Sequence, residues 1–190
     1  GMMKYVNPKE SYMDGQPYPK VDPAIRYADI LLMYAEALNE LTTTYQIQSW
    51  DGNETYSISR NITTMKEAIL PIRLRAGVPN YEDLGNGDPY NDKDKLREAI
   101  KHERQVEFLG ENQRYYDLRR WMDAPKEESE MIYGCNTTVP KEYREYFYEQ
   151  VVVPSTQTSW SKKKYFWPVA YAELQKNARL TQAPGWPSFD

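Results

Sequence analysis

Apolar residues recur at helical spacing in several stretches of this 190-residue chain, and long polar loops separate these stretches. The first stretch opens at Asp22-Pro23, a pair typical of an N-cap and the first helical residue, and runs to about Asn39. It is apolar on nearly every side, so we expect this helix to be buried between other helices. Further helices are predicted over residues 63–75, 94–109, 113–122 and 171–176.

The segments between and around these helices are rich in turn-forming residues. Residues 1–21 hold prolines and Asp14-Gly15 and predict an extended lead-in, whereas residues 42–61 predict a turn-rich loop or a short hairpin. Beyond residue 122 the texture changes to an irregular C-terminal wrap, with a β-prone run at 151–153. The predicted fold is therefore mainly α, with helical hairpins over 22–122. The spacing of Tyr34, Ala35 and Leu38 is compatible with tetratricopeptide-like packing.

Composition narrows the class of protein. Leu, Ile, Val and Phe together supply 34 of the 190 residues, and 17 Tyr and 5 Trp replace part of the missing apolar mass. The net charge is −4, which argues against nucleic acid as the main partner. No apolar run reaches the roughly 18 residues that span a bilayer. One cysteine and one histidine predict no disulfide and no metal site, and no motif predicts a cofactor.

The best candidates for ligand contacts are aromatic residues in loops. Tyr45, Trp50 and Tyr56 lie in the 42–61 loop, close to Asp51 and Asn53, and Trp160 lies in a similar polar setting. A flat ring can stack on the apolar face of a pyranose while amides and carboxylates take its hydroxyls. The same rings also fit an ordinary loop core, so both interpretations stay open.

The strongest charge pattern lies between residues 103 and 120. Glu103, Glu107 and Glu111 recur every four residues, so the first two share a helix face and would repel each other unless cations lie opposite. We interpret the pattern as a structural arginine–carboxylate network, with an acid-lined binding groove as the alternative. The other members of this predicted network are Arg26, Glu36, Arg73, Arg75, Arg104, Arg114, Asp117, Arg119, Arg120 and Trp121.

Four blocks of the sequence resemble the SusD/RagB family. They are Arg26–Glu40 (RYADILLMYAEALNE), Ile72–Pro79 (IRLRAGVP), His102–Trp121 (HERQVEFLGENQRYYDLRRW) and the ending from Phe166-Trp167-Pro168 to Pro184-Gly185-Trp186. The blocks stand in family order and cover most of the chain. Departures at Pro71, Asn112 and Ala183 affect local turns only.

The resemblance implies an all-α, tetratricopeptide-like superhelix and no enzymatic activity. It implies a cell-surface lipoprotein of the bacterial outer membrane that binds a nutrient, commonly an oligosaccharide. The partner would be a SusC-like TonB-dependent transporter. All four blocks belong to the C-terminal part of the family. We therefore expect residues 1–190 to be one soluble C-terminal region, without the upstream lipid anchor and the first helical hairpins. The motif residues carry over as scaffold.

Two alternative functions stay open on the sequence. One is a helical-repeat scaffold that only contacts the transporter, and the weaker one is a carbohydrate-active enzyme, since acidic residues always offer carboxylate pairs. The sequence also predicts that the first two helices leave apolar surface exposed, or covered by another copy of the chain.

Overall fold

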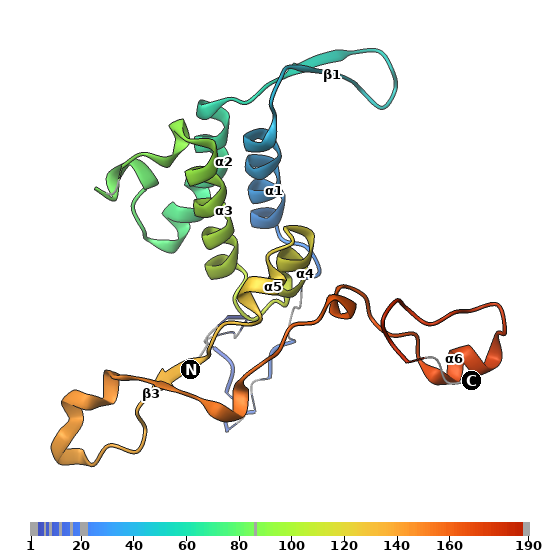
Figure 1. Ribbon diagram of the computed structural model, residues 1–190. Helices are drawn as coiled ribbons and strands as arrows, with labels where there is room; N and C mark the ends of the chain where they lie inside the picture. Colours follow the sequence, from blue (N-terminus) through green and yellow to red (C-terminus); the bar gives the residue numbers. More distant parts are fainter. Residues whose placement is uncertain are drawn as a thin grey trace. The chain divides into compact units, whose positions relative to one another are not determined.

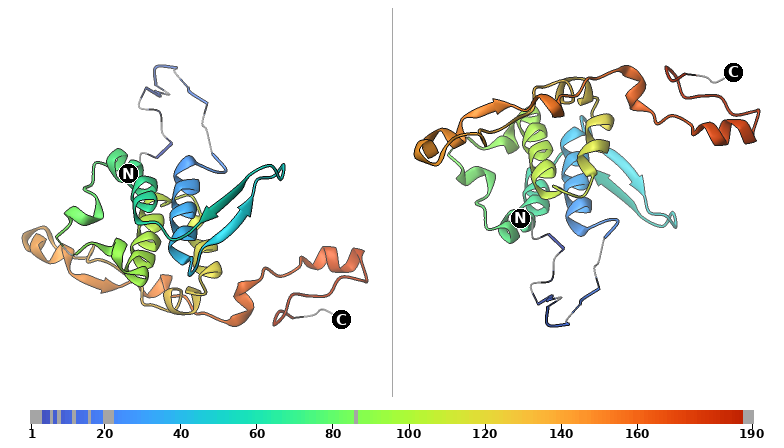
Figure 2. Two further views of the ribbon diagram at one scale, coloured as in Figure 1. Left: turned by 90° about the horizontal axis from the view of Figure 1, so that it is seen from above. Right: turned by 90° about the horizontal axis from the view of Figure 1, so that it is seen from below.

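The computed structural model describes residues 4, 5, 7, 9–11, 13–15, 17–19, 23–85 and 87–187. The chain forms two compact units, Gly1–Leu109 and Gly110–Asp190. The helices and strands of the first unit (Figures 1 and 2) are α1 (Tyr27–Glu40), β1 (Tyr45–Gln48), β2 (Thr55–Ile58), α2 (Ile62–Ala76), η1 (Tyr81–Asp83), η2 (Pro89–Asn91) and α3 (Lys93–Glu107).

The core of the first unit lies between α1, α2 and α3. Helix α1 packs against both other helices, as Figure 1 shows for the blue and green ribbons. Apolar side chains on the facing sides of the three helices are almost fully buried, together with two tyrosines of the 3-10 helices. These residues are Leu32, Ala35, Leu38, Met65, Ala68, Ile69, Ile72, Tyr81, Tyr90, Leu96 and Ile100. The prediction of a mainly helical fold is confirmed.

The start of α1 differs from the prediction. Asp22, the expected N-cap, lies outside the described residues, and residues 23–26 are not helical. Arg26 takes the N-cap position in an extended conformation and makes no side-chain cap. Its guanidinium reaches across the unit to Glu107, with Nη1 2.8 Å from Oε1. The Arg26 side chain therefore forms an ion pair with a distant residue and does not cap α1, whereas the sequence predicted a local cap.

The burial of α1 is also more one-sided than its sequence predicted. Ile30, Met33 and Tyr34 are more than 40% exposed. The expectation of a helix enclosed by other helices is thus wrong for the described structure, because α2 and α3 cover one side of α1. The expectation of exposed apolar surface on the first two helices is confirmed, and α2 adds Leu74 to it.

The ends of α2 and α3 follow local rules. The Asn61 side chain accepts a hydrogen bond from Thr64 N at the start of α2, and Gly77 ends the helix with a positive φ of 71°. Pro71 lies inside α2 on its exposed side. Asp92 caps α3 through the backbone N–H groups of residues 94 and 95. Helix α3 ends at Glu107, two residues earlier than predicted.

The second unit is less regular. Its elements are α4 (Gln113–Arg120), α5 (Ala124–Glu127), β3 (Tyr133–Cys135), η3 (Lys141–Tyr148), β4 (Gln150–Val152), η4 (Pro154–Thr156), η5 (Lys162–Tyr165) and α6 (Tyr171–Lys176). Strands β3 and β4 pair antiparallel. Helix α4 ends before Trp121, two residues earlier than predicted, and α6 spans the predicted residues. The predicted helical region 22–122 thus spans both units.

Candidate ligand-binding surfaces

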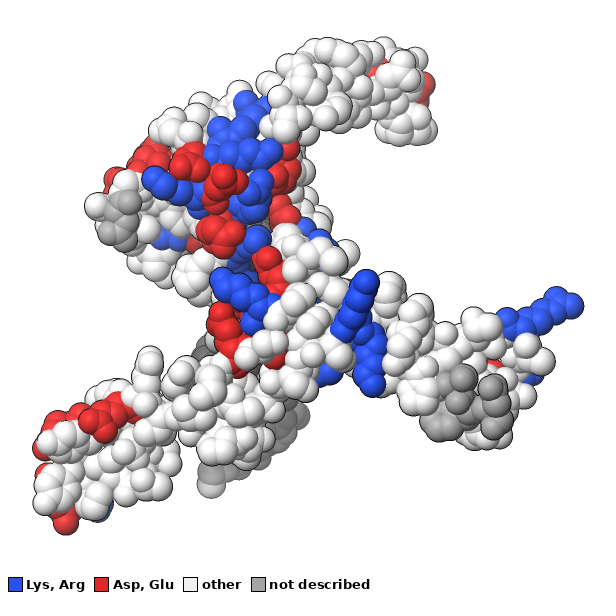
Figure 3. All heavy atoms as spheres, viewed as in Figure 1, with Lys and Arg blue, Asp and Glu red and all other residues white. Residues whose placement is uncertain are grey.

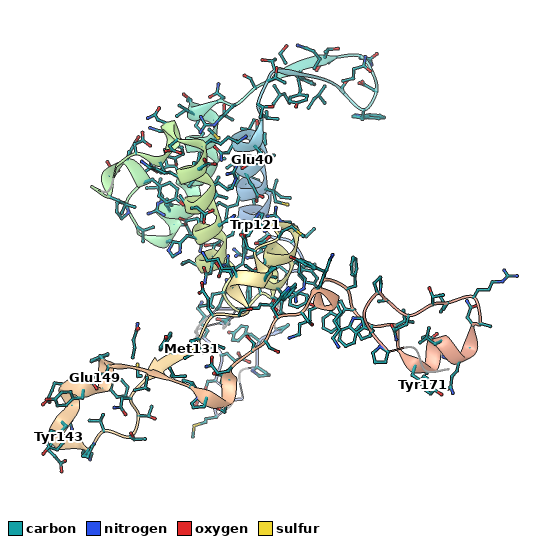
Figure 4. All side chains as sticks on the ribbon, in the orientation of Figure 1. Glu40, Trp121, Met131, Tyr143, Glu149 and Tyr171 are labelled. Atoms are coloured by element: carbon teal, nitrogen blue, oxygen red, sulfur yellow. The ribbon has the colours of Figure 1, made fainter. Side chains whose placement is uncertain are left out.

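A β-hairpin between α1 and α2 carries the predicted aromatic residues. It extends away from the helix ends in Figure 1, near the labelled Glu40 of Figure 4. Tyr45 pairs with Ile58 and Ile47 pairs with Tyr56. Residues directly opposite in an antiparallel pair share a face, so these four side chains form one face of the hairpin. We call it the apolar hairpin face.

The opposite face of the hairpin is polar. Gln46 lies opposite Ser57 and Gln48 opposite Thr55. The Gln46 amide donates to the Ser57 hydroxyl at 2.8 Å, and that hydroxyl donates to Gln46 Oε1 at 3.0 Å. This pair holds the two strands together without using the apolar hairpin face. Tyr45, Ile47 and Tyr56 are each about half exposed.

The hairpin tip holds Trp50 in solvent. Its side chain is 98% exposed. Hydrogen bonds within the turn fix the backbone around it: Ser49 N donates to Glu54 O at 2.9 Å, and the Ser49 hydroxyl donates to Asp51 Oδ1 at 2.5 Å. The same Ser49 hydroxyl bond is the main cause that lowers the pKa of the Asp51 carboxyl. The tip is therefore built without support from the indole ring.

The hairpin carries negative but no positive side chains. Between Leu41 and Arg60 the sequence contains Asp51 and Glu54 and no Lys or Arg. The arm above the helices in Figure 3 accordingly shows red atoms and no blue ones near its end. The Tyr56 hydroxyl donates to the Glu54 carboxylate, which raises the pKa of Tyr56. This surface therefore offers aromatic rings and carboxylates, but no cations, to a ligand.

A buried polar clamp holds the base of the hairpin, and the sequence analysis missed it. Arg60 follows β2 and donates through Nε and Nη2 to Asn39 Oδ1, at 3.1 and 3.0 Å. Its Nη2 also donates to Tyr90 O at 2.8 Å, and the Asn39 amide donates to Lys93 O at 2.9 Å. Asn39 is fully buried. An amide inside an otherwise apolar helix was the available signal.

Trp160, the fourth candidate, belongs to the second unit and has a different environment. Its half-buried ring meets Tyr165 edge-on, with the ring centroids 4.8 Å apart. The Arg119 guanidinium lies 5.5 Å from the Trp160 centroid and 3.4 Å from that of Tyr115. Trp160 thus packs in an aromatic–arginine stack, whereas Tyr45, Trp50 and Tyr56 share the hairpin.

Buried ion pairs tie α3 to α1 and α2. Arg104 Nη1 lies 2.8 Å from Asp29 Oδ1, and both side chains are less than 10% exposed. Arg73 pairs with Glu103, which also accepts a hydrogen bond from the Tyr81 hydroxyl at 2.8 Å. Burial is the main cause that raises the pKa of Tyr81, followed by the Glu103 charge. Asp29 is the partner that the predicted network lacked.

Glu107 is a buried carboxylate that pairs with two cations. Arg26 contacts Oε1 at 2.8 Å and Arg75 contacts Oε2 at 2.5 Å. The Glu107 side chain is 8% exposed, and the Arg75 side chain is 60% exposed. Glu103 and Glu107 therefore lie buried on one side of α3, as their spacing predicted, and face cations from α2 and from the residue before α1. The structural interpretation of these carboxylates fits this geometry better than an acid-lined groove does.

The remaining members of the predicted network lie elsewhere. Arg114, Arg119 and Arg120 pair with Glu127, Glu128 and Asp117 of the second unit. Trp121, labelled in Figure 4, has the Arg120 guanidinium 4.7 Å from its ring centroid. Glu127 and Glu128 were not expected as partners. Glu36 is half-buried on α1, and Glu111 is half-buried in the loop before α4, so it does not continue the face of α3.

Within the described ranges, no group of three or more His, Cys, Asp and Glu side chains is placed to hold a metal ion. Across the same residues, every helix falls short of the length and apolar character that a membrane crossing requires.

The chain is mainly helical, with an exposed aromatic hairpin and a buried arginine–carboxylate network. This combination points to a class of helical proteins that the following comparison identifies as the SusD family. The sequence profile of the SusD family matches residues 1–186, and the chain belongs to this family. A SusD-like protein of Formosa agariphila is 36% identical over 96 residues, which cover 50% of this chain and 16% of that protein.

Solved structures agree with this assignment. A SusD-like protein from Bacteroides fragilis NCTC 9343 superposes with a TM-score of 0.60 at 29% identity, over 90% of this chain and 27% of that one. A SusD superfamily protein from Bacteroides vulgatus ATCC 8482 gives a TM-score of 0.53 at 28% identity, over 90% of this chain and 29% of that one. The chain thus spans less than a third of the length of these relatives.

Proposed function

We propose that this chain is part of a non-catalytic, cell-surface nutrient-binding protein that captures an oligosaccharide and delivers it to a SusC-like TonB-dependent transporter. Membership of the SusD family supports this role. In the whole protein, an upstream lipid anchor would hold it at the outer membrane. The contribution proposed for this chain is reversible capture by stacking.

The observation that carries the proposal is the exposure of Trp50. A tryptophan that is 98% exposed contributes nothing to the core of the unit. Its position on a hydrogen-bonded turn leaves the ring free to stack on the apolar face of a pyranose. Tyr45 and Tyr56, half exposed on the hairpin, would extend the contact to further sugar residues. Asp51 and Glu54, close to these rings in the sequence, would accept hydrogen bonds from the sugar hydroxyls.

A second candidate function rests on the aliphatic part of the same hairpin. Ile47 is about half exposed between the two tyrosines. An exposed aliphatic side chain stacks poorly on a sugar but packs well against a protein. This favours the scaffold alternative, in which the apolar hairpin face contacts the transporter or another part of the whole protein.

Calorimetric titration of the chain with maltohexaose, cellohexaose and xylohexaose tests the proposal. The Trp50→Ala variant should bind the preferred sugar about tenfold or more weakly. Tryptophans that become buried when a ligand binds often supply much of the binding free energy. Gln48→Ala, on the polar face of the same hairpin, is the matched control and should stay within about twofold.

Three outcomes would contradict the proposal in different ways. Unchanged affinity in Trp50→Ala removes the ring from the site. No binding of any oligosaccharide, together with retention of a protein partner through the apolar hairpin face, favours the scaffold function. Sustained hydrolysis of a glycoside would overturn the assignment as a non-enzyme.

A further inference from the structure

A cavity in the second unit lies beside the 3-10 helix η3. The chain leaves β3, forms η3 and returns through β4, and Asn136 N donates to Phe147 O at 3.0 Å across this arm. Tyr143 and Glu149 mark the arm in Figure 4. The cavity has a volume of about 470 Å³, within the range of roughly 300–1,000 Å³ that is typical of ligand sites. Val139, Lys141, Arg144, Phe147 and Tyr148 line it.

Two cations line this cavity without a partner among the described residues. Lys141 and Arg144 form no ion pair or side-chain hydrogen bond within the part of the chain that the structure describes. They lie on either side of a kink in η3 at Tyr143 (φ −119°, ψ 38°), and both line the same cavity. By contrast, Arg114, Arg119 and Arg120 of the same unit are all paired with carboxylates.

The carboxylates of the arm lie outside the lining of the cavity. Glu142, Glu145 and Glu149 belong to the same segment, but none of them lines the cavity. Two cations that line one cavity, and that have no partner among the described residues, attract an anion there even though the whole chain has a net charge of −4. A guanidinium also offers two parallel donors, which match the oxygens of a carboxylate or a sulfate.

The rest of the cavity wall is aromatic and exposed. Phe147 is 41% and Tyr148 is 81% exposed, and their ring centroids are 5.2 Å apart in an edge-on arrangement. Neither ring is needed to fill a core, because no residue of η3 is buried. A flat apolar ring next to a pair of cations suits a ring-shaped ligand with an anionic substituent better than a free inorganic anion.

We propose that this cavity is a binding site for a negatively charged sugar residue, a uronate or a sulfated pyranose. The rings of Phe147 and Tyr148 stack on the sugar, and Arg144 and Lys141 bind its anionic group. The proposal rests on oligosaccharide binding as the proposed function, but it concerns a second surface. The hairpin, which lacks cations, is the surface proposed for neutral sugar residues.

Binding of two anionic probes tests the site: hexagalacturonate, which carries carboxylates, and a sulfated carrageenan hexasaccharide. The double variant Lys141→Ala/Arg144→Ala should weaken binding of the preferred anionic probe by about tenfold or more, because charge-assisted hydrogen bonds are lost. The control Lys162→Ala/Arg179→Ala removes the same charge from exposed positions elsewhere in the unit and should stay within about twofold. Neutral maltohexaose, cellohexaose and xylohexaose should be unaffected by both variants.

The two anionic probes and the two double variants distinguish the possible outcomes. A larger loss for hexagalacturonate assigns the site to uronates, and a larger loss for the carrageenan probe assigns it to sulfated sugars. Equal losses of affinity in the two double variants would show unspecific charge attraction and overturn the proposal. The proposal would also be overturned if neither anionic probe binds. If neutral sugars bind through Trp50 while the anionic site fails, the proposed function stands without this inference. If the anionic probe depends on Arg144 and no neutral sugar binds, the hairpin assignment alone fails.

A third measurement protects the test against misfolding. Lys141 and Arg144 are exposed, so the double variant should keep the far-ultraviolet circular dichroism and the unfolding midpoint of the parent chain. Phe147→Ala should weaken the anionic probe while leaving the charge unchanged. A Phe147→Ala variant with full affinity would contradict stacking and reduce the site to a simple anion contact.

Discussion

The three-helix core and the β1–β2 hairpin belong to the same compact unit but use their polar and aromatic side chains in opposite ways. In the core, Arg104, Arg73 and Glu107 are buried and paired between helices. In the hairpin, Trp50 and Tyr56 face solvent. In this unit, buried charged side chains hold the helices together, whereas the exposed rings of the hairpin contribute little to the core.

Removal of Glu107 should give the largest effect on the core side of this comparison. Glu107→Ala leaves Arg26 and Arg75 without their shared carboxylate, one of them largely buried. We expect the free energy of unfolding to fall by about 3–5 kcal/mol, the range typical of breaking a buried ion pair. Urea unfolding followed by circular dichroism measures it.

The control for Glu107 lies on the same helix. Glu98 pairs with Lys101 at 3.1 Å, and the Glu98 side chain is 71% exposed. Glu98→Ala should change the unfolding free energy by less than about 1 kcal/mol. If Glu107→Ala shifts it by less than about 0.5 kcal/mol, the core ion pairs are surface decoration and the contrast with the hairpin disappears.

A single buried hydroxyl should have the next largest effect. The Tyr81 hydroxyl donates to the Glu103 carboxylate at 2.8 Å and to Ala99 O at 3.1 Å. Tyr81→Phe should lower the unfolding free energy by about 1.5–3 kcal/mol, because hydrogen bonds to charged groups are strong. Tyr34→Phe, on the exposed side of α1, should stay within about 0.5 kcal/mol in the same assay. Equal values for the two variants would contradict the buried network.

Acid titration should detect the ion pairs at the rim of the core. Hydrogen bonding from Arg97 is the main cause that lowers the pKa of Glu40 below its usual value of 4.5. A lowered pKa in the folded state stabilises the fold above pH 4.5, and this contribution is lost as the pH falls through the folded pKa. Glu40→Gln should therefore show a smaller loss of unfolding free energy between neutral and acid pH than the parent chain. An identical acid limb in both proteins would show that Glu40 does not contribute.

The hairpin ring should have the smallest effect on stability. Trp50→Ala should change the unfolding free energy by less than about 0.5 kcal/mol, because the ring is 98% exposed. Leu32→Ala in α1, which is fully buried, should cost about 2–5 kcal/mol in the same experiment. A large loss in Trp50→Ala would show that the hairpin tip packs against something and would weaken the binding role.

Local rules predicted much of the secondary structure. Asn61, Gly77 and Asp92 act through neighbouring backbone groups, so the sequence around α2 and α3 contains the information needed to place their ends. A short hairpin was one of two structures predicted for residues 42–61, the other being a turn-rich loop, and its register could not be read from turn residues alone. The predicted start of α1 was wrong because the Arg26 side chain is bound by Glu107, which lies 81 residues away in the sequence.

The candidate site was predictable in part for the same reason. Aromatic residues in a polar loop are visible in the sequence, so Tyr45, Trp50 and Tyr56 could be named, but their exposure became known only from the structure. The partners of ion pairs depend on which helices meet, so Asp29, Glu127 and Glu128 were missed. The cavity at Lys141 and Arg144 lies along the kinked segment η3, which the sequence pattern did not indicate.

The most direct test of whether the hairpin is a binding arm on a separately stabilised core is amide hydrogen exchange. It is measured with and without the neutral oligosaccharide that the chain binds. We expect amides of α1, α2 and α3 to exchange slowest in both states, and amides of residues 45–58 to exchange faster and to gain protection with the sugar. Protection gained elsewhere, with exchange of residues 45–58 unchanged, would contradict the account.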